Sequence, residues 1–333
     1  MSATTSFFIT IYFTKKFIEF MERRGLYEKI RFDYTPHLQD IHKHKEKTPT
    51  MGGVVVSSSI IISSVLWAKW DNLFVWTSLC VLFMFTLLGL VDDLIKIKTS
   101  KNGLSKQTKL YTQIIIGVLS GLFLYFYNSF PLNLEIPFLK SPLYLGGFFI
   151  FWTVLVIVAS SNAVNITDGL DGLAVGSLVF VGVGLGILCY ITGHKIFSSY
   201  LFLPYIKECA ELVPILGAFV GALLGFLWFN CFPAQIFLGD AGALSLGGFL
   251  GYVSVLSKKE LLLVILGGVF VVETLSVILQ VISFKLRKKR IFKVAPLHHH
   301  FQVKGLPEAK IIIRFWIISA ILMLVALSTL KIR

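Results

Sequence analysis

Long apolar segments fill this chain and limit the folds that it can adopt. A helix needs about twenty predominantly apolar residues to cross the hydrocarbon core of a membrane, and segments of about that length recur ten times. They lie near 5–21, 51–68, 72–91, 110–127, 144–162, 172–192, 212–229, 241–257, 261–284 and 311–330. Charged residues make up only 15% of the chain, against about a quarter in an ordinary soluble domain. The sequence therefore predicts an all-α polytopic membrane protein with about ten transmembrane helices, and a single membrane domain over residues 1–333.

Two stretches interrupt this regular pattern. Lys15 and Lys16 divide the first segment, which makes it the weakest of the ten. No signal-peptide pattern precedes these lysines, so we expect the helix to remain in the protein. Three prolines, Pro131, Pro137 and Pro142, follow the fourth segment and predict an irregular loop or a short hairpin. The four cysteines lack metal-ligand spacing, and we expect them to be packing residues.

Basic residues gather on one side of the predicted membrane. Alternation of the ten crossings places five loops on one face, at 22–50, 92–109, 163–171, 230–240 and 285–310. The first, second and last of these loops carry most of the lysines and arginines, so the positive-inside rule makes this face cytoplasmic and both termini extracytoplasmic. Topology thus accounts for the net charge of +13, and we expect no nucleic-acid partner.

Five aspartates lie at the ends of the apolar segments, all on the predicted cytoplasmic face. They are Asp92, Asp93, Asp168, Asp171 and Asp240. Acidic side chains at membrane depth are costly and are kept where they face protein, water or an ion. Carboxylates gathered at a membrane surface, with lysines between them, are typical of a site for a metal ion and phosphates. We therefore predict an active-site cleft on the cytoplasmic face.

The adjacent pair Asp92 and Asp93 lies at the predicted end of the third helix. Negative charge is unfavourable at a helix C-terminus because of the macrodipole, and a helix end exposed to solvent would favour lysine. Binding of Mg²⁺ or of a cationic partner removes this conflict. Lys106 and Lys109 follow in the same loop and suit phosphate.

The other polar loops leave alternatives open. Thr50 precedes two glycines and a helix, where it either caps that helix or contacts substrate. Asp168 and Asp171 are three residues apart and share a face if their segment is helical, although either residue can also cap the following helix. Asp240 follows a glycine at a helix start, which fits an N-cap, but a Mg²⁺ ligand is the favoured interpretation.

Three consecutive histidines, His298, His299 and His300, follow the basic run 285–290. On any regular backbone they cannot all face one way, so at most two point into a site. A zinc site lacks other ligands at suitable spacing. Phosphate contact or proton handling fits these histidines better.

Six segments of the chain resemble a known family in their order along the sequence. They are TPTMGG, LVDD, GLSKQTKL, NAVNITDGLDGLA, FNCFPAQIFLGDAG and PLHHHF, which begin at Thr48, Leu90, Gly103, Asn162, Phe229 and Pro296. Any one of them is weak, but the six together are similar to the phospho-N-acetylmuramoyl-pentapeptide transferases over nearly the whole chain. These enzymes are a branch of the polyprenyl-phosphate N-acetylhexosamine-1-phosphate transferases.

The resemblance implies a fold, a reaction and partners. The implied fold is a ten-helix bundle in the bacterial cytoplasmic (inner) membrane, surrounded by membrane lipid and usually a homodimer. The implied reaction transfers phospho-MurNAc-pentapeptide from UDP-MurNAc-pentapeptide to undecaprenyl phosphate with Mg²⁺ as cofactor. It gives lipid I and UMP, and it is the first membrane step of peptidoglycan biosynthesis.

The resemblance also assigns roles to residues. The implied catalytic residues are Asp92, Asp93, Asp240 and His298. Asp240 is the implied Mg²⁺ ligand, with Asp92 as a second candidate. Phe237 is expected to stack on uracil, with Asn230 in the same pocket. The remaining implied substrate-binding residues are Lys45, Thr50, Lys96, Lys106, Lys109, Asn162, Asn165, Asp168, Asp171, Gln280 and His299.

The chain differs from the family pattern at two positions, and two other functions remain as alternatives to the transferase. Lys47 stands where the family commonly has glycine, and Ala243 replaces a common serine. The nearest rival is a sister enzyme that transfers GlcNAc-1-phosphate to the same lipid. An ion-coupled transporter is a rival from another class, but its acidic groups would lie at the midplane and not at one surface.

Overall fold

The structure, a computed structural model, describes residues 1–27, 48–99, 103–127, 130–137, 139 and 141–331. Each of the ten predicted segments contains a helix. The long helices are α1 (Ser2–Arg23), α3 (Gly52–Trp67), α4 (Leu73–Lys98), α5 (Lys106–Phe126), α6 (Phe148–Thr167), α7 (Leu173–Gly193), α9 (Leu212–Asn230), α10 (Gly239–Leu256), α12 (Gly268–Arg287) and α14 (Glu308–Ser328). Shorter elements are β1 (Asn133–Leu134), β2 (Leu143–Tyr144), α8 (Lys195–Tyr200), η2 (Lys207–Glu211), α11 (Glu260–Leu266), α13 (Leu297–Val303) and η3 (Thr329–Lys331).

The length and composition of these helices support the membrane assignment. Within the described ranges, eight helices are long and apolar enough to cross a membrane. The 16-residue α3 is apolar but shorter, and α1 carries the two lysines that weaken it. The all-α polytopic prediction is confirmed. Ten crossings and the side on which the termini lie stay predictions.

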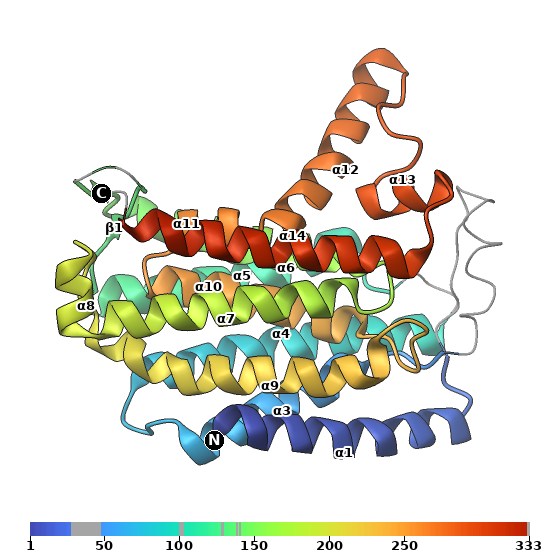
Figure 1. Cartoon of the computed structure of the whole chain (residues 1–333), viewed down its shortest axis with the longest axis horizontal. Helices are drawn as coiled ribbons and strands as arrows, with labels where there is room; N and C mark the ends of the chain where they lie inside the picture. Colours follow the sequence, from blue (N-terminus) through green and yellow to red (C-terminus); the bar gives the residue numbers. More distant parts are fainter. Residues whose placement is uncertain (28–47, 100–102, 128–129, 138, 140, 332–333) are drawn as a thin grey trace.

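Helix α10 forms the centre of the bundle (Figure 1), and every residue from Asp240 to Leu256 in it is buried. Glycines bring its neighbours into backbone contact. A Cβ built on Gly53 of α3 would lie 2.0 Å from the nitrogen of Gly242, and one built on Gly89 of α4 would lie 2.3 Å from the carbonyl oxygen of Asp240. Helices α3 and α4 are therefore held directly against the start of α10.

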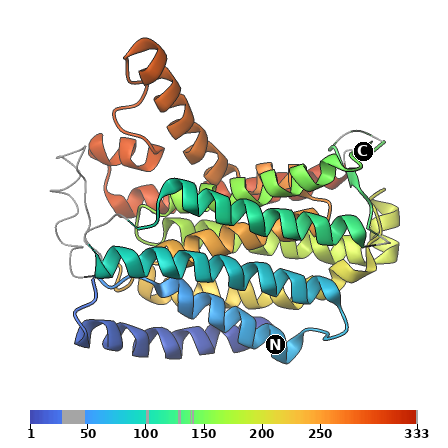
Figure 2. The ribbon, with the colours of Figure 1, turned by 180° about the vertical axis from the view of Figure 1, so that it is seen from behind.

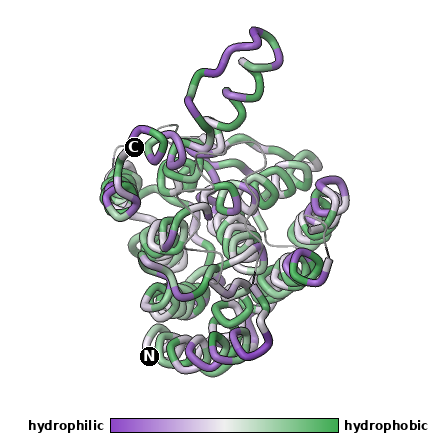
Figure 3. The backbone as a smooth tube through the Cα atoms, turned by 90° about the vertical axis from the view of Figure 1, so that its right-hand side faces the viewer, coloured by the Kyte–Doolittle hydropathy of each residue, from purple (hydrophilic) through white to green (hydrophobic). Residues whose placement is uncertain are grey.

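The predicted helix 261–284 is wrong in one respect, because the chain forms two helices there. Helix α11 ends at Leu266 and α12 begins at Gly268, with the break at Gly267. A pair of glycines tolerates such a break, since neither residue has a side chain to pack in a continuous helix. Figures 1 and 2 show α12 leaving the bundle at a steep angle with α13 beside it. Figure 3 shows hydrophilic and hydrophobic positions mixed on this projecting part, while green hydrophobic positions recur along the other helices.

A short antiparallel hairpin lies at the opposite end of the bundle from α13. Its strands pair Asn133 with Tyr144 and Leu134 with Leu143, which confirms the predicted hairpin. Nearby, the buried Lys258 ammonium packs 4.3 Å from the ring centroid of Phe130, and it also lies over Phe149. These cation–π contacts join the turn between α10 and α11 to Phe130, which precedes the hairpin, and to Phe149 on α6.

Candidate active site

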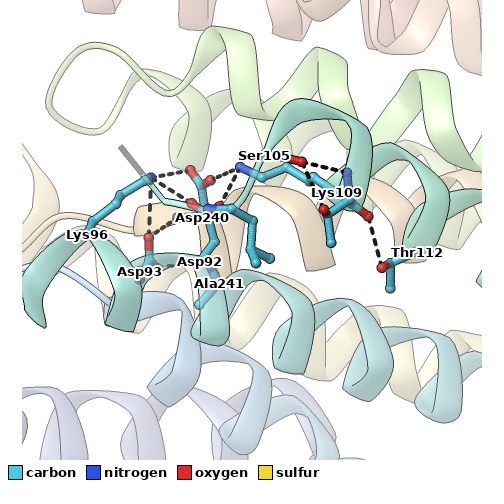
Figure 4. Close-up of polar contacts among 10 residues, drawn as sticks. Asp92, Asp93, Lys96, Ser105, Lys109, Thr112, Asp240 and Ala241 are labelled. Atoms are coloured by element: carbon cyan, nitrogen blue, oxygen red, sulfur yellow. Dashed lines mark hydrogen bonds and ion pairs between the residues drawn. The ribbon is translucent and has the colours of Figure 1, made fainter. Parts of the chain in front are cut away.

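Three carboxylates meet where α4 and α10 approach each other (Figure 4). Asp92 and Asp93 lie on α4, and Asp240 lies in the first turn of α10. One oxygen from each carboxylate lies within 4.8 Å of the others, and this group is called the aspartate cluster below. Asp92 and Asp93 are fully buried, and Asp240 is 9% exposed. The prediction that separated aspartates gather into one site is confirmed for these three.

Asp93 connects the two helices. Its Oδ1 accepts a hydrogen bond from the backbone nitrogen of Asp240 at 3.2 Å, and its Oδ2 accepts one from Ala241 at 3.0 Å. It therefore satisfies backbone N–H groups at the N-terminus of α10, where no capping side chain precedes the helix and negative charge is favourable. Gly239, at φ 73°, makes room, because a Cβ there would lie 2.7 Å from Asp93 Oδ2.

The position of the Asp92–Asp93 pair within its helix differs from the prediction. Helix α4 continues to Lys98, so the pair lies inside the helix and not at its C-terminus. The predicted conflict between these charges and the helix macrodipole is therefore wrong, because such a conflict arises in the last turn of a helix. The charges are balanced by neighbouring lysines, one of which, Lys96, lies on the same helix.

Two ammonium groups lie among the three carboxylates. Lys96 Nζ is 3.1 Å from Asp92 Oδ2 and 3.2 Å from Asp240 Oδ1, and it is 3.6 Å from Asp93 Oδ1. Lys109 Nζ is 3.1 Å from Asp92 Oδ1 and donates a hydrogen bond to Asp240 Oδ2. The arrangement places positive charge at one point from two helices, α4 and α5, and is suited to an anionic ligand that carries a cation with it.

The turn before α5 holds Lys109 in this place. The backbone nitrogen of Leu104 donates to Asp92 Oδ1 at 2.8 Å, and Ser105 caps α5 by accepting from the nitrogen of Thr108. Gly103 has φ 85°, and a Cβ on it would lie 2.6 Å from Asp92 Oδ1. The turn thus brings Lys109 to the aspartate cluster. Lys106 lies exposed on the first turn of α5, and its contact with substrate stays a prediction.

The donor set of the aspartate cluster fits a Mg²⁺ ion. Carboxylate oxygens are hard ligands, and Mg²⁺ is usually held by one or two carboxylates together with phosphate oxygens and water. Asp93 already accepts two backbone hydrogen bonds, which leaves Asp92 and Asp240 as the better placed ligands. Within the described ranges, Asp92 Oδ2 is buried and accepts no hydrogen bond, and Lys96 Nζ lies 3.1 Å from it.

The loop that precedes α10 lies against the loop that precedes α3. The backbone nitrogen of Phe237 donates to Pro49, and its carbonyl oxygen accepts from Gly52. The Phe237 ring is half-buried, and Asn230 is buried, with its amide donating to the carbonyl oxygen of Ile236 at 2.8 Å. Phe237 and Asn230 thus share one loop, while their contact with uracil stays a prediction.

Thr50 does not cap α3. Met51 occupies the N-cap position with φ 70°, and no side chain caps the helix. The Thr50 hydroxyl is buried and has no hydrogen-bond partner in the part of the chain that the structure describes. It lies beside the aspartate cluster, because a Cβ on Gly239 would lie 3.0 Å from Thr50 Oγ1 and 2.7 Å from Asp93 Oδ2. Of the two alternatives, capping is wrong and substrate contact stays a prediction.

The predicted loop at 163–171 is mostly helical, since α6 runs to Thr167. Asn162 therefore lies on the helix, where its Nδ2 donates to Gln113 Oε1 at 2.8 Å. Asn165, on the same helix, is half-buried. Asp168 and Asp171 lie in the turn that follows, and neither caps α7, whose N-cap is Gly172. Asp171 Oδ2 instead accepts from the nitrogen of Ala234, which ties this turn to the loop before α10.

Comparison with known proteins gives the family. The model for glycosyl transferase family 4 matches residues 75–258. A phospho-N-acetylmuramoyl-pentapeptide-transferase of Campylobacter curvus is 48% identical over 332 residues, covering 98% of this chain and 92% of the relative. Relatives of the same name from Campylobacter jejuni and a Nitratiruptor species are 47% and 48% identical, with the same coverage. The chain belongs to this family. It is accordingly a multi-pass protein of the bacterial cytoplasmic membrane.

The family's histidine segment forms α13, and its three rings make different contacts. His298 is fully buried, with Nδ1 at 3.3 Å from Glu273 Oε2. His299 Nδ1 pairs with Gln302 Oε1 at 2.8 Å, and His300 Nδ1 accepts from the backbone nitrogen of Lys293. The three histidines thus make different contacts, and the rings of His298 and His299 lie side by side with centroids 4.2 Å apart. That at most two of them point into a site stays a prediction.

Two buried carboxylates next to the histidine segment were not predicted from the sequence. Glu273 on α12 contacts His298, and Glu308 at the start of α14 accepts from the backbone nitrogen of Asp171 and from Gln302 Nε2. Each lies within or beside an apolar run, and a lone acidic residue at membrane depth is itself the signal that could have found them.

Gln280 and Lys45 are the last two of the predicted substrate-binding residues. Gln280 holds a backbone turn, since its Oε1 accepts from the nitrogens of Ile291 and Phe292 and its Nε2 donates to the carbonyl oxygen of Phe292. Its place in the wall of the cleft stays a prediction. Lys45 lies outside the described residues.

Proposed function

We propose that the protein transfers phospho-MurNAc-pentapeptide from UDP-MurNAc-pentapeptide to undecaprenyl phosphate, which gives lipid I and UMP. In the cell this is the first membrane step of peptidoglycan synthesis. Family membership over 98% of the chain supports the proposal. The observation that carries it is the aspartate cluster, joined by Lys96 and Lys109 at one end of a membrane helix bundle. A soluble nucleotide and a lipid phosphate can meet only at such a surface.

The proposed chemistry is phosphoryl transfer by direct attack. An oxygen of the lipid phosphate forms a bond to the β-phosphorus of the UDP-sugar, the bond from this phosphorus to the bridging oxygen breaks, and UMP leaves. A phosphate monoester has a second pKa of about 6, so the lipid phosphate is largely a dianion near neutral pH. Positioning and charge neutralisation then matter more than proton removal.

Two lysines of the site can position the phosphates and neutralise their charge. Lys96 and Lys109 bring ammonium groups from two helices to the point where Asp92 and Asp240 meet. When bound, Mg²⁺ would add positive charge beside the phosphates, and Asp240 and Asp92 would hold it. Asp93 serves by keeping the N-terminus of α10, and with it Asp240, in place.

The nucleotide and sugar are proposed to lie across the neighbouring loops. Phe237 would stack on uracil beside Asn230, and Thr50, Asn165, Asp168, Gln280 and His299 would line the rest of the cleft. A homodimer, as is usual in the family, is part of the same proposal.

Two experiments test this proposal. With purified protein, Mg²⁺ and undecaprenyl phosphate, we expect UMP release from UDP-MurNAc-pentapeptide and none from UDP-GlcNAc. The reverse preference would assign the protein to the sister branch, and no UMP release from either donor would leave the transporter as the better candidate. Exchange of labelled UMP into the donor without lipid phosphate would contradict direct attack and indicate a phospho-enzyme.

A further inference from the structure

The buried Glu273 contacts His298, the histidine of the proposed active site, with both of its carboxylate oxygens. Glu273 lies in the second turn of α12 and is fully buried, as is His298 at the start of α13. Glu273 Oε1 accepts a hydrogen bond from the backbone nitrogen of His298 at 3.2 Å, and Glu273 Oε2 lies 3.3 Å from His298 Nδ1. Both oxygens of one carboxylate therefore face a single residue 25 positions away in the sequence.

The opposite edge of the imidazole ring faces the turn that carries Asp168. A Cβ built on Gly169 would lie 2.4 Å from His298 Nε2. The ring is thus fixed between Glu273 on its Nδ1 side and the Gly169 backbone on its Nε2 side. Because His298 is fully buried, it has little freedom to turn away from either contact.

We propose that Glu273 is a positioning residue that acts through His298. Its Oε2, 3.3 Å from Nδ1, favours a proton on that nitrogen. Nε2 is then the unprotonated nitrogen of the neutral ring, on the side of the Asp168 turn. A carboxylate that binds one ring nitrogen commonly sets the tautomer of a functional histidine in this way. The inference rests on the proposed function, in which His298 takes part in transfer.

Packing alone does not account for Glu273. A carboxylate within a membrane-crossing helix is costly, and an apolar side chain of similar size would fill the same space without that cost. The other buried glutamate near α13, Glu308, contacts Asp171 and Gln302. Glu273 is therefore the acidic group that the described contacts place on His298.

A double-mutant cycle separates positioning from simple stabilisation. We expect Glu273→Gln to lower kcat about 10–100-fold, the usual cost of losing such a partner, with the KM for the UDP donor changed less than about threefold. In the His298→Ala background the same change should have no further effect on kcat, because the residue through which it acts is gone. Glu273→Asp should recover part of the loss. An equal loss of kcat in both backgrounds would overturn the proposal.

Glu260→Gln is the matched control. Glu260 is also a buried glutamate, but it lies at the start of α11, near the hairpin end of the bundle. We expect its kcat to match that of the wild type at the assay pH. If the wild type itself fails to transfer the sugar phosphate, the proposed function fails. If the wild type is active but the two substitutions are additive, only the positioning role fails.

A measurement on the unmodified protein keeps the proposal testable if Glu273→Gln does not fold. Nitrogen-15 NMR of histidine-labelled protein, with the His298 signals assigned from their absence in His298→Ala, reports the tautomer directly. We expect a proton on Nδ1 and none on Nε2 in the neutral ring. A proton on Nε2 would overturn the proposal.

Discussion

The adjacent residues Asp92 and Asp93 have separate tasks although they share a helix turn. Asp93 accepts two backbone hydrogen bonds from α10, so it positions that helix. Asp92 faces Lys96, Lys109 and the turn at Leu104. Asp240 joins it from α10 and is the most accessible of the three carboxylates. This division favours Asp92 and Asp240 as the residues that meet the metal and the phosphates.

Substitution of Asp240 tests this division. We expect Asp240→Ala to reduce turnover by at least about a thousandfold, because the variant loses the proposed metal ligand and unbalances two ammonium groups. The protein should still fold, since among the described residues no backbone hydrogen bond depends on the Asp240 side chain. UMP release and thermal unfolding in detergent measure the two effects. Asp71→Ala, at an exposed carboxylate in the loop between α3 and α4, is the control and should keep full activity.

Glycine 103 offers a second test at the same scale. Gly103→Ala should lower kcat about tenfold or more, because the added methyl group would lie against the Asp92 carboxylate and displace it. Gly25→Ala is a matched control, because Gly25 also has positive φ but no described residue lies within 4 Å of a Cβ built on it. Both variants should lose a similar amount of stability, about 1 kcal/mol, from backbone strain. Equal activity in the two variants would argue against a role for the Asp92 position.

At the scale of whole helices, the sequence predicted where each helix lies along the chain better than the residue at which it ends. Segment length and hydropathy located all ten apolar segments, because the membrane requires them. The ends were misjudged where tertiary contacts allow a helix to continue past its apolar run. Helix α4 reaches Lys98 because Lys96 pairs with the aspartates, and α6 reaches Thr167 with Asn162 bonded to Gln113. Glu273 was missed because its partner lies 25 residues away.

The turn between α10 and α11 predicts an unusual dependence of stability on pH. Burial raises the pKa of the Glu260 carboxyl to about 7, and burial lowers the pKa of the nearby Lys258 ammonium to about 8. Lys259 and Glu135 are the other charged neighbours of Glu260. The folded state holds the Glu260 proton more tightly than the unfolded chain does, so this carboxyl becomes destabilising as the pH rises from about 5 through 7.

Glu260→Gln tests this sign. The variant cannot acquire the buried charge, so its Tm relative to wild type should rise by a few degrees between pH 5 and pH 8. Thermal unfolding of both proteins across this range is the measurement. A Tm difference that stays constant or falls as the pH rises would show that Glu260 remains ionised when folded.

For the whole molecule, the proposed function requires the aspartate cluster and the hairpin to face opposite sides of the membrane. In inverted and right-side-out vesicles, a membrane-impermeant thiol reagent should label Ser105→Cys only from the cytoplasmic side and Ser141→Cys only from the other side. The background must lack the exposed Cys80 and Cys231. Labelling of both positions from one side would contradict the predicted topology. The single domain over residues 1–333 and the homodimer remain predictions at this scale.

The central claim is that residues from two helices far apart in the sequence, α4 and α10, form one divalent-cation site at a membrane surface. Electron paramagnetic resonance of added Mn²⁺, which replaces Mg²⁺ in such sites, counts bound ions without depending on activity. We predict about one tightly bound Mn²⁺ per wild-type chain and none in Asp240→Asn. Retention of the ion by that variant, or its absence from the folded wild type, would contradict the account.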